Sequence, residues 1–249
     1  EEKYPGVQWS QFVGAEMMAK KHDISKEEMD RFALASHEKA AAATKAGAFD
    51  AEIVPIPVET PDGEAMHTVD EGIRFDASLE GIASVKLLSP DGRISAALAS
   101  QICDGSSAAL IVSEAMLKEH GLTPLARIVD LTVTAGDPVI MLEEPLFATD
   151  KALKKAGLSI NDIDLYEVNE AFASVVLHFM EKSGVDHARV NPNGGGISMG
   201  HPIGATGVML INTLLDELER TDKQVGVATL CVGEGMAVAT CIERVEGFA

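Results

Sequence analysis

A glycine-rich segment over residues 191–207 contains the first side chain suited to acid–base chemistry, His201. It stands between Gly200 and Pro202, just ahead of an expected helix, and an imidazole titrates near neutral pH, as a general base must. So many glycines indicate a backbone that approaches something closely. The segment is neither a P-loop, since it lacks Gly-Lys-Ser/Thr, nor a dinucleotide fingerprint in a βαβ register. His201 is therefore either a general base or a structural histidine.

A second segment, Cys231-Val232-Gly233-Glu234-Gly235, combines a thiol with glycines. A thiol ionises near pH 8.5, within reach of acid–base work, and the glycines leave backbone N–H groups, such as that of Gly233, to bind an oxyanion. The alternative for Cys231 is a small buried hydrophobe beside a tight turn. Cys103 also precedes small residues, and we interpret it as structural.

A third segment, Val168-Asn169-Glu170-Ala171-Phe172, ends an expected strand and opens an expected helix. Taken alone, Asn169 is typical of a helix N-cap, with a role in a functional site as the alternative. All three segments follow strands or precede helices, where α/β sheets tend to place their sites. We therefore expect an imidazole, a thiol and an amide to meet in one small cavity.

Composition limits the classes of function. The chain has 39 acidic and 20 basic residues, a net charge of −19, which disfavours binding to nucleic acid or to an anionic membrane surface. Three cysteines are too few for a disulfide framework and favour a reducing, cytoplasmic location. No apolar run approaches the ~18 residues that span a bilayer. The first residue is Glu1 rather than Met, and we expect the chain to be the trailing part of a longer polypeptide.

Hydrophobic periodicity indicates the elements that must position these side chains. Ser25 and Glu28 form an S-x-x-E capping box for a helix over 25–48. Residues 53–58 are β-branched but interrupted by two prolines, which suits an edge strand or extended segment, and the lobe that follows is expected to be irregular. After Gly105 strands and helices alternate, which favours α/β layers. The expected strands are 108–112, 126–133, 163–168, 225–230 and 236–242, and the expected helices are 113–120, 145–156, 170–182 and 204–220.

Taken in order, the segments N-E-A-F (169–172), G-H-P-I-G-A-T-G (200–207) and C-x-G-x-G (231–235) resemble the thiolases, that is, acetyl-CoA acetyltransferases and 3-ketoacyl-CoA thiolases. D-E-G-I-R at 70–74 and D-G-S-S-A at 104–108 are also similar to family motifs, so the resemblance covers nearly the whole chain. It implies an α/β fold of duplicated αβαβα layers. Residues 1–122 would form the loop lobe and the end of the N-terminal half, and residues 123–249 one complete C-terminal half.

The resemblance implies acyl transfer through a cysteine thiolate, which takes an acyl group from a thioester and passes it to CoA, or to the carbanion of acetyl-CoA in the reverse direction. That nucleophile lies in a C-x-S-G segment that this sequence lacks, so we expect the chain alone to be inactive. By position, His201 would activate the nucleophile and Cys231 would move the proton at the α-carbon. Asn169 would fix a water that completes one oxyanion site, and the Gly233 N–H would contribute to a second.

The resemblance also implies the ligands. Ser100 and Arg74 match lobe positions that contact CoA, and Glu170 would lie behind the reacting groups. CoA and acyl-CoA would be substrates, with no permanently bound cofactor and no metal. A homodimer or homotetramer is expected from the resemblance alone, as is a place in fatty acid and lipid metabolism.

Departures from the family pattern concern the acyl pocket and the thiol. The run Q-F-V-G-A-E at 11–16 replaces M-G-x-T-A-E, K-L-L-S at 86–89 replaces K-P-A-F, and Leu98 replaces an asparagine, so we expect a longer or bulkier acyl group than acetoacetyl. Glu234 replaces a glycine and would raise the pKa of Cys231 if its carboxylate faced inward.

Two other functions stay open at this point. One is a non-catalytic, truncated thiolase-like scaffold or assembly partner. The other is a condensing enzyme of the ketosynthase type, which uses a second histidine where Cys231 stands. The presence of Cys231 and of the N-E-A-F segment argues against the ketosynthase.

Overall fold

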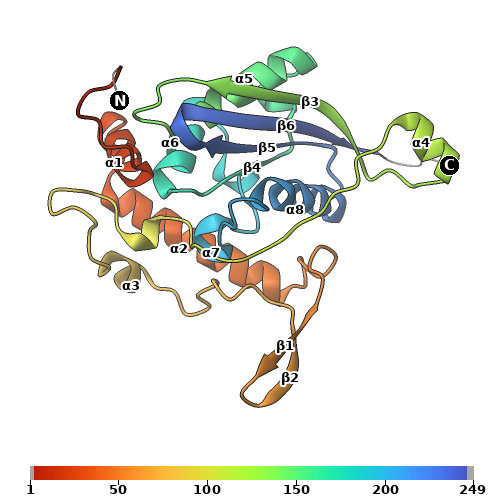
Figure 1. Ribbon diagram of the computed structural model, residues 1–249, viewed down its shortest axis with the longest axis horizontal. Helices are drawn as coiled ribbons and strands as arrows, with labels where there is room; N and C mark the ends of the chain where they lie inside the picture. The colour runs from red at the N-terminus through yellow and green to blue at the C-terminus, as the bar shows by residue number, and fades with distance from the viewer. Residues whose placement is uncertain (1–2, 246–249) are drawn as a thin grey trace.

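A four-stranded sheet forms the centre of the computed structural model, which describes residues 3–245 (Figure 1). The strand order is β3 (Ala126–Ala135), β6 (Met236–Arg244), β5 (Val225–Val232) and β4 (Leu165–Val168). Strands β4 and β5 are parallel, whereas β6 runs antiparallel to both β5 and β3. The carboxyl ends of β4 and β5 therefore lie side by side at one edge of the sheet.

Both faces of this sheet are covered by helices. Successive side chains of a strand point to opposite faces, so a strand with apolar residues at every position must be buried on both sides. Tyr166 belongs to the larger core, which includes α5 (Glu144–Ala156) and α6 (Ala173–Ser183). Its neighbour Leu165 belongs to a second core, formed with α8 (Thr206–Arg220). The α/β layers expected from the sequence are thus confirmed.

Helix α8 packs through an apolar stripe. Leu210, Leu214 and Leu218 recur every fourth residue and are all buried. Burial of a leucine side chain contributes about 1.5–3 kcal/mol, so this stripe fixes α8 against β4 and β5. The first turn of α8, which follows the glycine-rich segment, is fixed with it.

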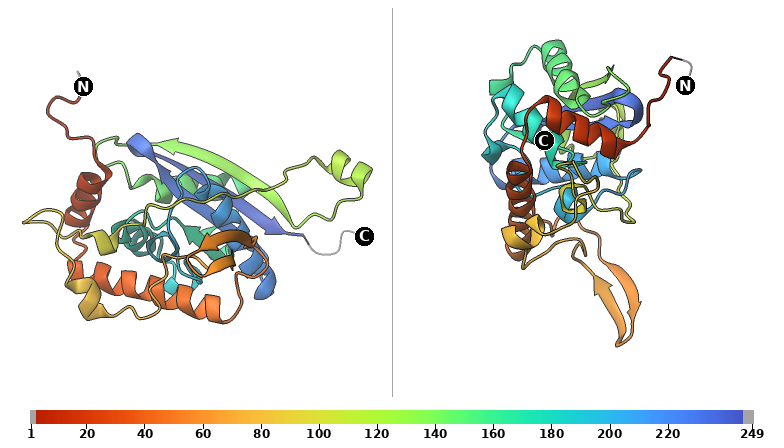
Figure 2. Two further views of the ribbon diagram at one scale, coloured as in Figure 1. Left: turned by 60° about the horizontal axis from the view of Figure 1, so that its bottom comes forward. Right: turned by 90° about the vertical axis from the view of Figure 1, so that its left-hand side faces the viewer.

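The helices of the first half are α1 (Gln11–Lys21), α2 (Lys26–Lys45) and α3 (Leu79–Ala83). The predicted capping box is present: the Glu28 N–H donates to Ser25 Oγ at 3.2 Å, and the Ser25 N–H donates to the Glu28 carboxylate at 2.8 Å. Helix α2 therefore begins where the sequence indicates. Figure 2 shows α1 and α2 alongside the layers of the second half.

The extended segment predicted at 53–58 is part of a hairpin. Strand β1 (Ile56–Thr60) pairs antiparallel with β2 (Gly63–His67), which the sequence analysis did not predict (Figure 1). Helix α1 was likewise not expected. The region otherwise has the irregular connections that we expected.

The strand expected at 108–112 is absent, and that prediction was wrong. A strand needs a partner ladder, and none of the residues described in the structure pairs with this segment. Ile102 and Leu110 are 99% and 79% exposed. The segment leads to α4 (Glu114–His120), which lies far from the sheet (Figure 1).

The other elements of the second half agree with prediction to within three residues. Helix α6 begins at Ala173 rather than at 170, because Phe172 is extended and forms a bridge with Ala99. No helix within residues 3–245 is long and apolar enough to cross a membrane. The remaining short elements are α7 (Gly196–Met199), η1 (Ala96–Leu98), η2 (Ile160–Asp162), η3 (His187–Arg189) and η4 (Gly233–Gly235).

Candidate active site

Asn169 and His201, which are 32 positions apart in the chain, meet in the structure. Asn169 directly follows β4, and its backbone N–H donates to the carbonyl of Thr229 on β5 at 3.0 Å. Its side-chain Nδ2 lies 3.4 Å from His201 Nε2. Asn169 is 1% exposed and is not the N-cap of α6, a position held by Phe172. Asn169 is therefore not a helix cap, and its side chain instead lies next to the imidazole of His201.

The hydrogen bonds of Thr206 indicate which ring nitrogen of His201 carries the proton. The Thr206 hydroxyl donates to the carbonyl of Pro202 at 3.0 Å and lies 2.6 Å from His201 Nδ1. All contacts are satisfied when Nδ1–H donates to Thr206 and Nε2 accepts from Asn169. Burial also lowers the pKa of His201. The ring is thus neutral at pH 7, with its basic nitrogen beside the Asn169 amide.

One acceptor at this site has no partner. The Oδ1 atom of Asn169 is buried, and residues 3–245 offer it no hydrogen bond. A buried carbonyl oxygen without a partner costs about 1–3 kcal/mol, so such groups are usually satisfied by water or by a ligand. The amide is therefore placed to hold a water or a substrate atom next to His201.

Backbone contacts hold the turn that presents His201. The His201 N–H donates to the Gln101 carbonyl at 2.9 Å, and the Gln101 side-chain amide donates to the carbonyls of Gly72 and Ile197 at 2.9 and 2.8 Å. Gly200 has φ of +100°, and an added Cβ would lie 2.5 Å from Cys103 Sγ. This backbone conformation favours glycine, and the contacts with Thr206 and Asn169 hold the imidazole that follows.

Glu170, the residue after Asn169, is buried, and its carboxylate bonds to residues other than His201. Its carboxylate accepts from the Ser36 hydroxyl at 2.6 Å, the Asn191 amide at 3.1 Å and the Ile197 backbone N–H at 3.1 Å. Burial raises its pKa, while these donors act in the opposite direction. The side chain thus joins α2, the glycine-rich segment and the end of β4.

Cys231 lies on β5 at the same sheet edge as Asn169. It is two residues beyond Thr229, whose carbonyl accepts the Asn169 N–H. Its side chain packs against the larger core, and burial raises the pKa of the thiol to about 11. Cys231 therefore keeps its proton at neutral pH in this environment. Its packing against the core agrees with the structural interpretation of Cys231, and its role as an acid–base group stays a prediction.

The expected influence of Glu234 on this thiol is not found. Glu234 is exposed, with φ of 62°, and does not contribute to the shift in the pKa of Cys231, which burial causes. The preceding Gly233 is also exposed, and an added Cβ there meets no atom within 4 Å. The turn after β5 therefore borders open space beside Cys231.

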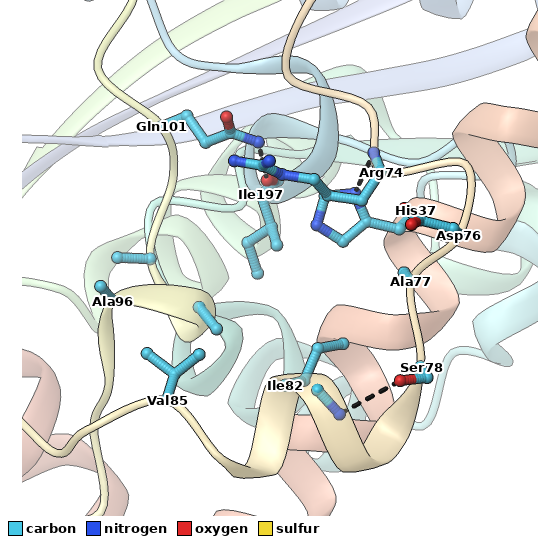
Figure 3. A pocket seen from close by; sticks show the side chains of 13 residues that line it. His37, Arg74, Asp76, Ala77, Ser78, Ile82, Val85, Ala96, Gln101 and Ile197 are labelled. Atoms are coloured by element: carbon cyan, nitrogen blue, oxygen red, sulfur yellow. Dashed lines mark hydrogen bonds between the residues drawn. The ribbon is translucent and has the colours of Figure 1, made fainter.

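A cavity of about 430 Å³ lies between the first-half loops and the glycine-rich segment (Figure 3). Arg74 is one of the residues that line it, and its backbone N–H donates to His37 Nδ1 at 3.2 Å. Ser100 is not among the lining residues, but it stands between two of them, Ala99 and Gln101. Its N–H donates to the Ala171 carbonyl at 3.0 Å, which connects the cavity wall to the Asn169 segment.

Several residues that build the site were not found from the sequence. Thr206 had a usable signal, since it lies five residues after His201 at the start of an expected helix. Ser36 and Gln101 had none, because their partners lie up to 162 positions away.

Comparison with known proteins gives the family. Residues 9–115 match the model of the thiolase N-terminal domain and residues 122–244 that of the thiolase C-terminal domain. A steroid 3-ketoacyl-CoA thiolase of Mycobacterium tuberculosis is 50% identical over 97% of this chain and 58% of its own length. An acetyl-CoA acetyltransferase of Paracoccus denitrificans is 47% identical over 92% of this chain and 59% of its own.

A crystal structure of the acetyl-CoA acetyltransferase of Bacillus anthracis superimposes with a TM-score of 0.90 at 39% identity, covering 97% of this chain and 61% of that one. The chain belongs to the thiolase family. It spans about three fifths of the length of the curated relatives that it matches.

Proposed function

We propose that the whole protein carrying this chain is a thiolase, an acyl-CoA C-acyltransferase that cleaves 3-ketoacyl-CoA with CoA or runs the reverse Claisen condensation. The observation that carries this proposal is the contact between the Asn169 amide and the basic Nε2 of His201. A neutral imidazole held by Thr206 is suited to take a proton from a thiol, as nucleophilic catalysis by cysteine requires.

In this proposal His201 activates a nucleophilic cysteine that lies outside the 249 residues, so the chain alone is inactive. Asn169 fixes a water beside His201, and together they stabilise the thioester oxyanion. The buried Asn169 Oδ1 without a partner supports this role, because it is an acceptor in position to orient such a water. The backbone N–H of Gly233 contributes to the second oxyanion site, and the open space at this glycine supports substrate access.

Cys231 is the acid–base group at the α-carbon. With a pKa raised to about 11, its thiol is protonated at neutral pH and can give this proton to the α-carbanion, which is a much stronger base than the thiolate. The thiolate left behind then takes a proton from the thiol of the incoming CoA. To act as a base in condensation it needs a neighbouring positive charge or hydrogen-bond donor that stabilises the thiolate. Cleavage leaves the same thiolate behind, so this requirement applies to both directions of the reaction.

CoA is a substrate in this proposal, and no permanently bound cofactor takes part. The CoA arm lies in the cavity of about 430 Å³, with Arg74 providing a local positive charge on a chain of net charge −19. Ser100, between two residues of the cavity wall, contacts the same arm. Ala99 of the cavity wall forms a bridge with Phe172, so the wall is joined to the segment that carries Asn169, which supports a CoA site next to the reacting groups.

The acyl group is proposed to be longer or bulkier than acetoacetyl. Phe12, in the run that departs from the family pattern, packs edge-on against Phe172 of the N-E-A-F segment at 5.3 Å between ring centroids. The side chain of Phe12 is partly exposed and able to contact a large substrate. A bulky substrate is also consistent with the name of the steroid 3-ketoacyl-CoA thiolase that is 50% identical.

A homodimer or homotetramer, a cytoplasmic location and a role in fatty acid and lipid metabolism are further parts of the proposal. The domain division after residue 122 is part of it as well. The scaffold and ketosynthase alternatives are not favoured, because both thiolase domains match and Cys231 stands at the sheet edge.

The test is CoA-dependent cleavage of 3-ketoacyl-CoA by the whole protein and its variants. His201→Ala and Cys231→Ala should each lower kcat by about 10²–10⁴, the usual contribution of an acid–base group. His120→Ala, an exposed histidine on α4, is the matched control and should keep full activity. Unchanged turnover in both site variants would reject the assignment.

A further inference from the structure

Two histidines and a glutamate from three helices come together away from the residues assigned to catalysis. His22 is the C-cap of α1, Glu143 the N-cap of α5, and His178 lies in α6. One potential ligand atom from each residue lies within 4.8 Å of those of the other two. The two imidazoles stack with 3.9 Å between ring centroids, and His22 Nε2 contacts Glu143 Oε1.

The buried histidine lacks the partner that its burial requires. His178 is 4% exposed, and its Nδ1 has no hydrogen bond within the described residues. A neutral imidazole has a lone pair on one ring nitrogen, which can bind a metal ion. A buried nitrogen without a partner, a second imidazole and a carboxylate thus lie within reach of one another.

We propose that His22, Glu143 and His178 bind a divalent first-row transition metal, with Zn²⁺ as the ion of best fit. Two imidazole nitrogens and one carboxylate oxygen are ordinary zinc ligands, and the fourth position would be taken by water. Calcium and magnesium are disfavoured, because they require mostly oxygen ligands. The family resemblance implied no metal, and positions 22, 143 and 178 form no metal-binding motif in the sequence.

The site needs a small rearrangement to close. Bonds of about 2.0–2.2 Å at tetrahedral angles place donor atoms about 3.3 Å apart, less than the 4.8 Å limit within which they now lie. The two ring planes, now 31° apart, must fan outward so that both lone pairs point at the ion. His22 can provide this motion, because it lies at the end of its helix and its side chain is 13% exposed.

A nearby cation occupies the second carboxylate oxygen. Lys21 Nζ lies 2.8 Å from Glu143 Oε2, and its side chain is 55% exposed. The ammonium leaves Oε1 to the metal and, being exposed, can move into solvent. Its charge nevertheless opposes that of the ion, so removing it should strengthen binding.

A metal here would join three helices that are distant in the chain. It would fix the end of α1 to α5 and α6, and α1 carries Phe12, which packs on Phe172 in the N-E-A-F segment. The ion would therefore stabilise the helix that borders the proposed acyl site. This role is structural and does not depend on the proposed thiolase activity.

The experiment is a titration of the chelator-treated whole protein with Zn²⁺ by calorimetry and with Co²⁺ by visible absorption. We expect one site per chain, with d–d bands for bound Co²⁺. At a Zn²⁺ concentration 100 times Kd, Tm of the whole protein should rise by about 3 °C. His178→Ala and Glu143→Gln should each raise Kd at least ~100-fold, since even groups that only orient ligands contribute 10–100-fold.

Two controls separate this site from surface binding. His120→Ala removes an exposed imidazole and should leave Kd unchanged, while Lys21→Ala should lower it. Absence of saturable binding, or binding retained in both His178→Ala and Glu143→Gln, would overturn the proposal. If these variants fail to fold, anomalous scattering from zinc-soaked crystals of the unaltered protein decides, and a zinc peak elsewhere overturns the proposal equally.

Discussion

The second half of the chain and the segment 101–113 differ in how their apolar residues are used. In the second half, alternating strand residues and the leucine stripe of α8 are buried against one another on both faces of the sheet. In 101–113 apolar side chains such as Ile102 and Leu110 are largely exposed, and no strand forms. Apolar composition produces regular structure only where a partner surface exists, which the sheet provides and the exposed segment lacks.

The largest difference between the two regions is expected when one leucine in each is truncated to alanine. Leu214→Ala removes a fully buried side chain from the core between α8 and the sheet, and should lower the free energy of unfolding by about 2–5 kcal/mol. Leu110→Ala removes one that is 79% exposed and should change it by less than about 0.5 kcal/mol. Urea unfolding of the isolated chain measures both, and equal losses would contradict the contrast.

A variant of Glu170 tests whether its buried hydrogen bonds stabilise the fold as apolar packing does. Glu170→Ala leaves the Ser36 hydroxyl, the Asn191 amide and the Ile197 N–H without their acceptor, and should destabilise the chain by about 1–3 kcal/mol. Glu27→Ala, whose carboxylate pairs with Arg31 on the exposed face of α2, should cost less than about 1 kcal/mol. A cost at Glu170 no larger than that at Glu27 would mean that the network is not stabilising.

The effect expected from Glu52 is confined to neutral and higher pH. Burial raises the pKa of Glu52 to about 7, so the folded state binds this proton more tightly than the unfolded chain does. Its stabilising contribution is therefore complete below about pH 4.5 and is lost as pH rises to about 7. Glu52→Gln should match the unaltered chain at pH 4.5 and exceed its stability at pH 8 by about 1–3 kcal/mol.

The control for this experiment is Glu59→Gln, which changes an exposed carboxylate on β1 and should leave the pH dependence of stability unaltered. Thermal unfolding at both pH values measures the difference. A Glu52→Gln variant with the same pH profile as the unaltered chain would show that this carboxyl group does not titrate between pH 4.5 and 7 in the folded state.

Sequence alone predicted the second half well, because its strands alternate and its helices carry clear stripes, as in α8. It failed for 108–112, where β-type composition has no partner strand within residues 3–245, and for the β1–β2 hairpin, where two prolines weaken the strand signal. These failures concern pairing, which is a long-range property.

For the site, the sequence predicted His201 and Asn169 by residue type and by family resemblance, and the structure places their side chains in contact. The functional roles of these residues, and of Cys231, Gly233, Ser100 and Arg74, stay predictions. The supporting contacts of Ser36 and Gln101 were beyond prediction, because no local pattern marks a serine or glutamine that bonds across the fold.

The tight turn at Gly200 has a practical consequence for chemical labelling. Cys103 is exposed, and its sulfur lies against the one backbone position in that turn where no side chain fits. An alkylating reagent that adds bulk to this sulfur would push on the turn and displace the adjoining imidazole. Inactivation by thiol-blocking reagents therefore would not identify the nucleophile unless Cys103 had first been replaced by serine.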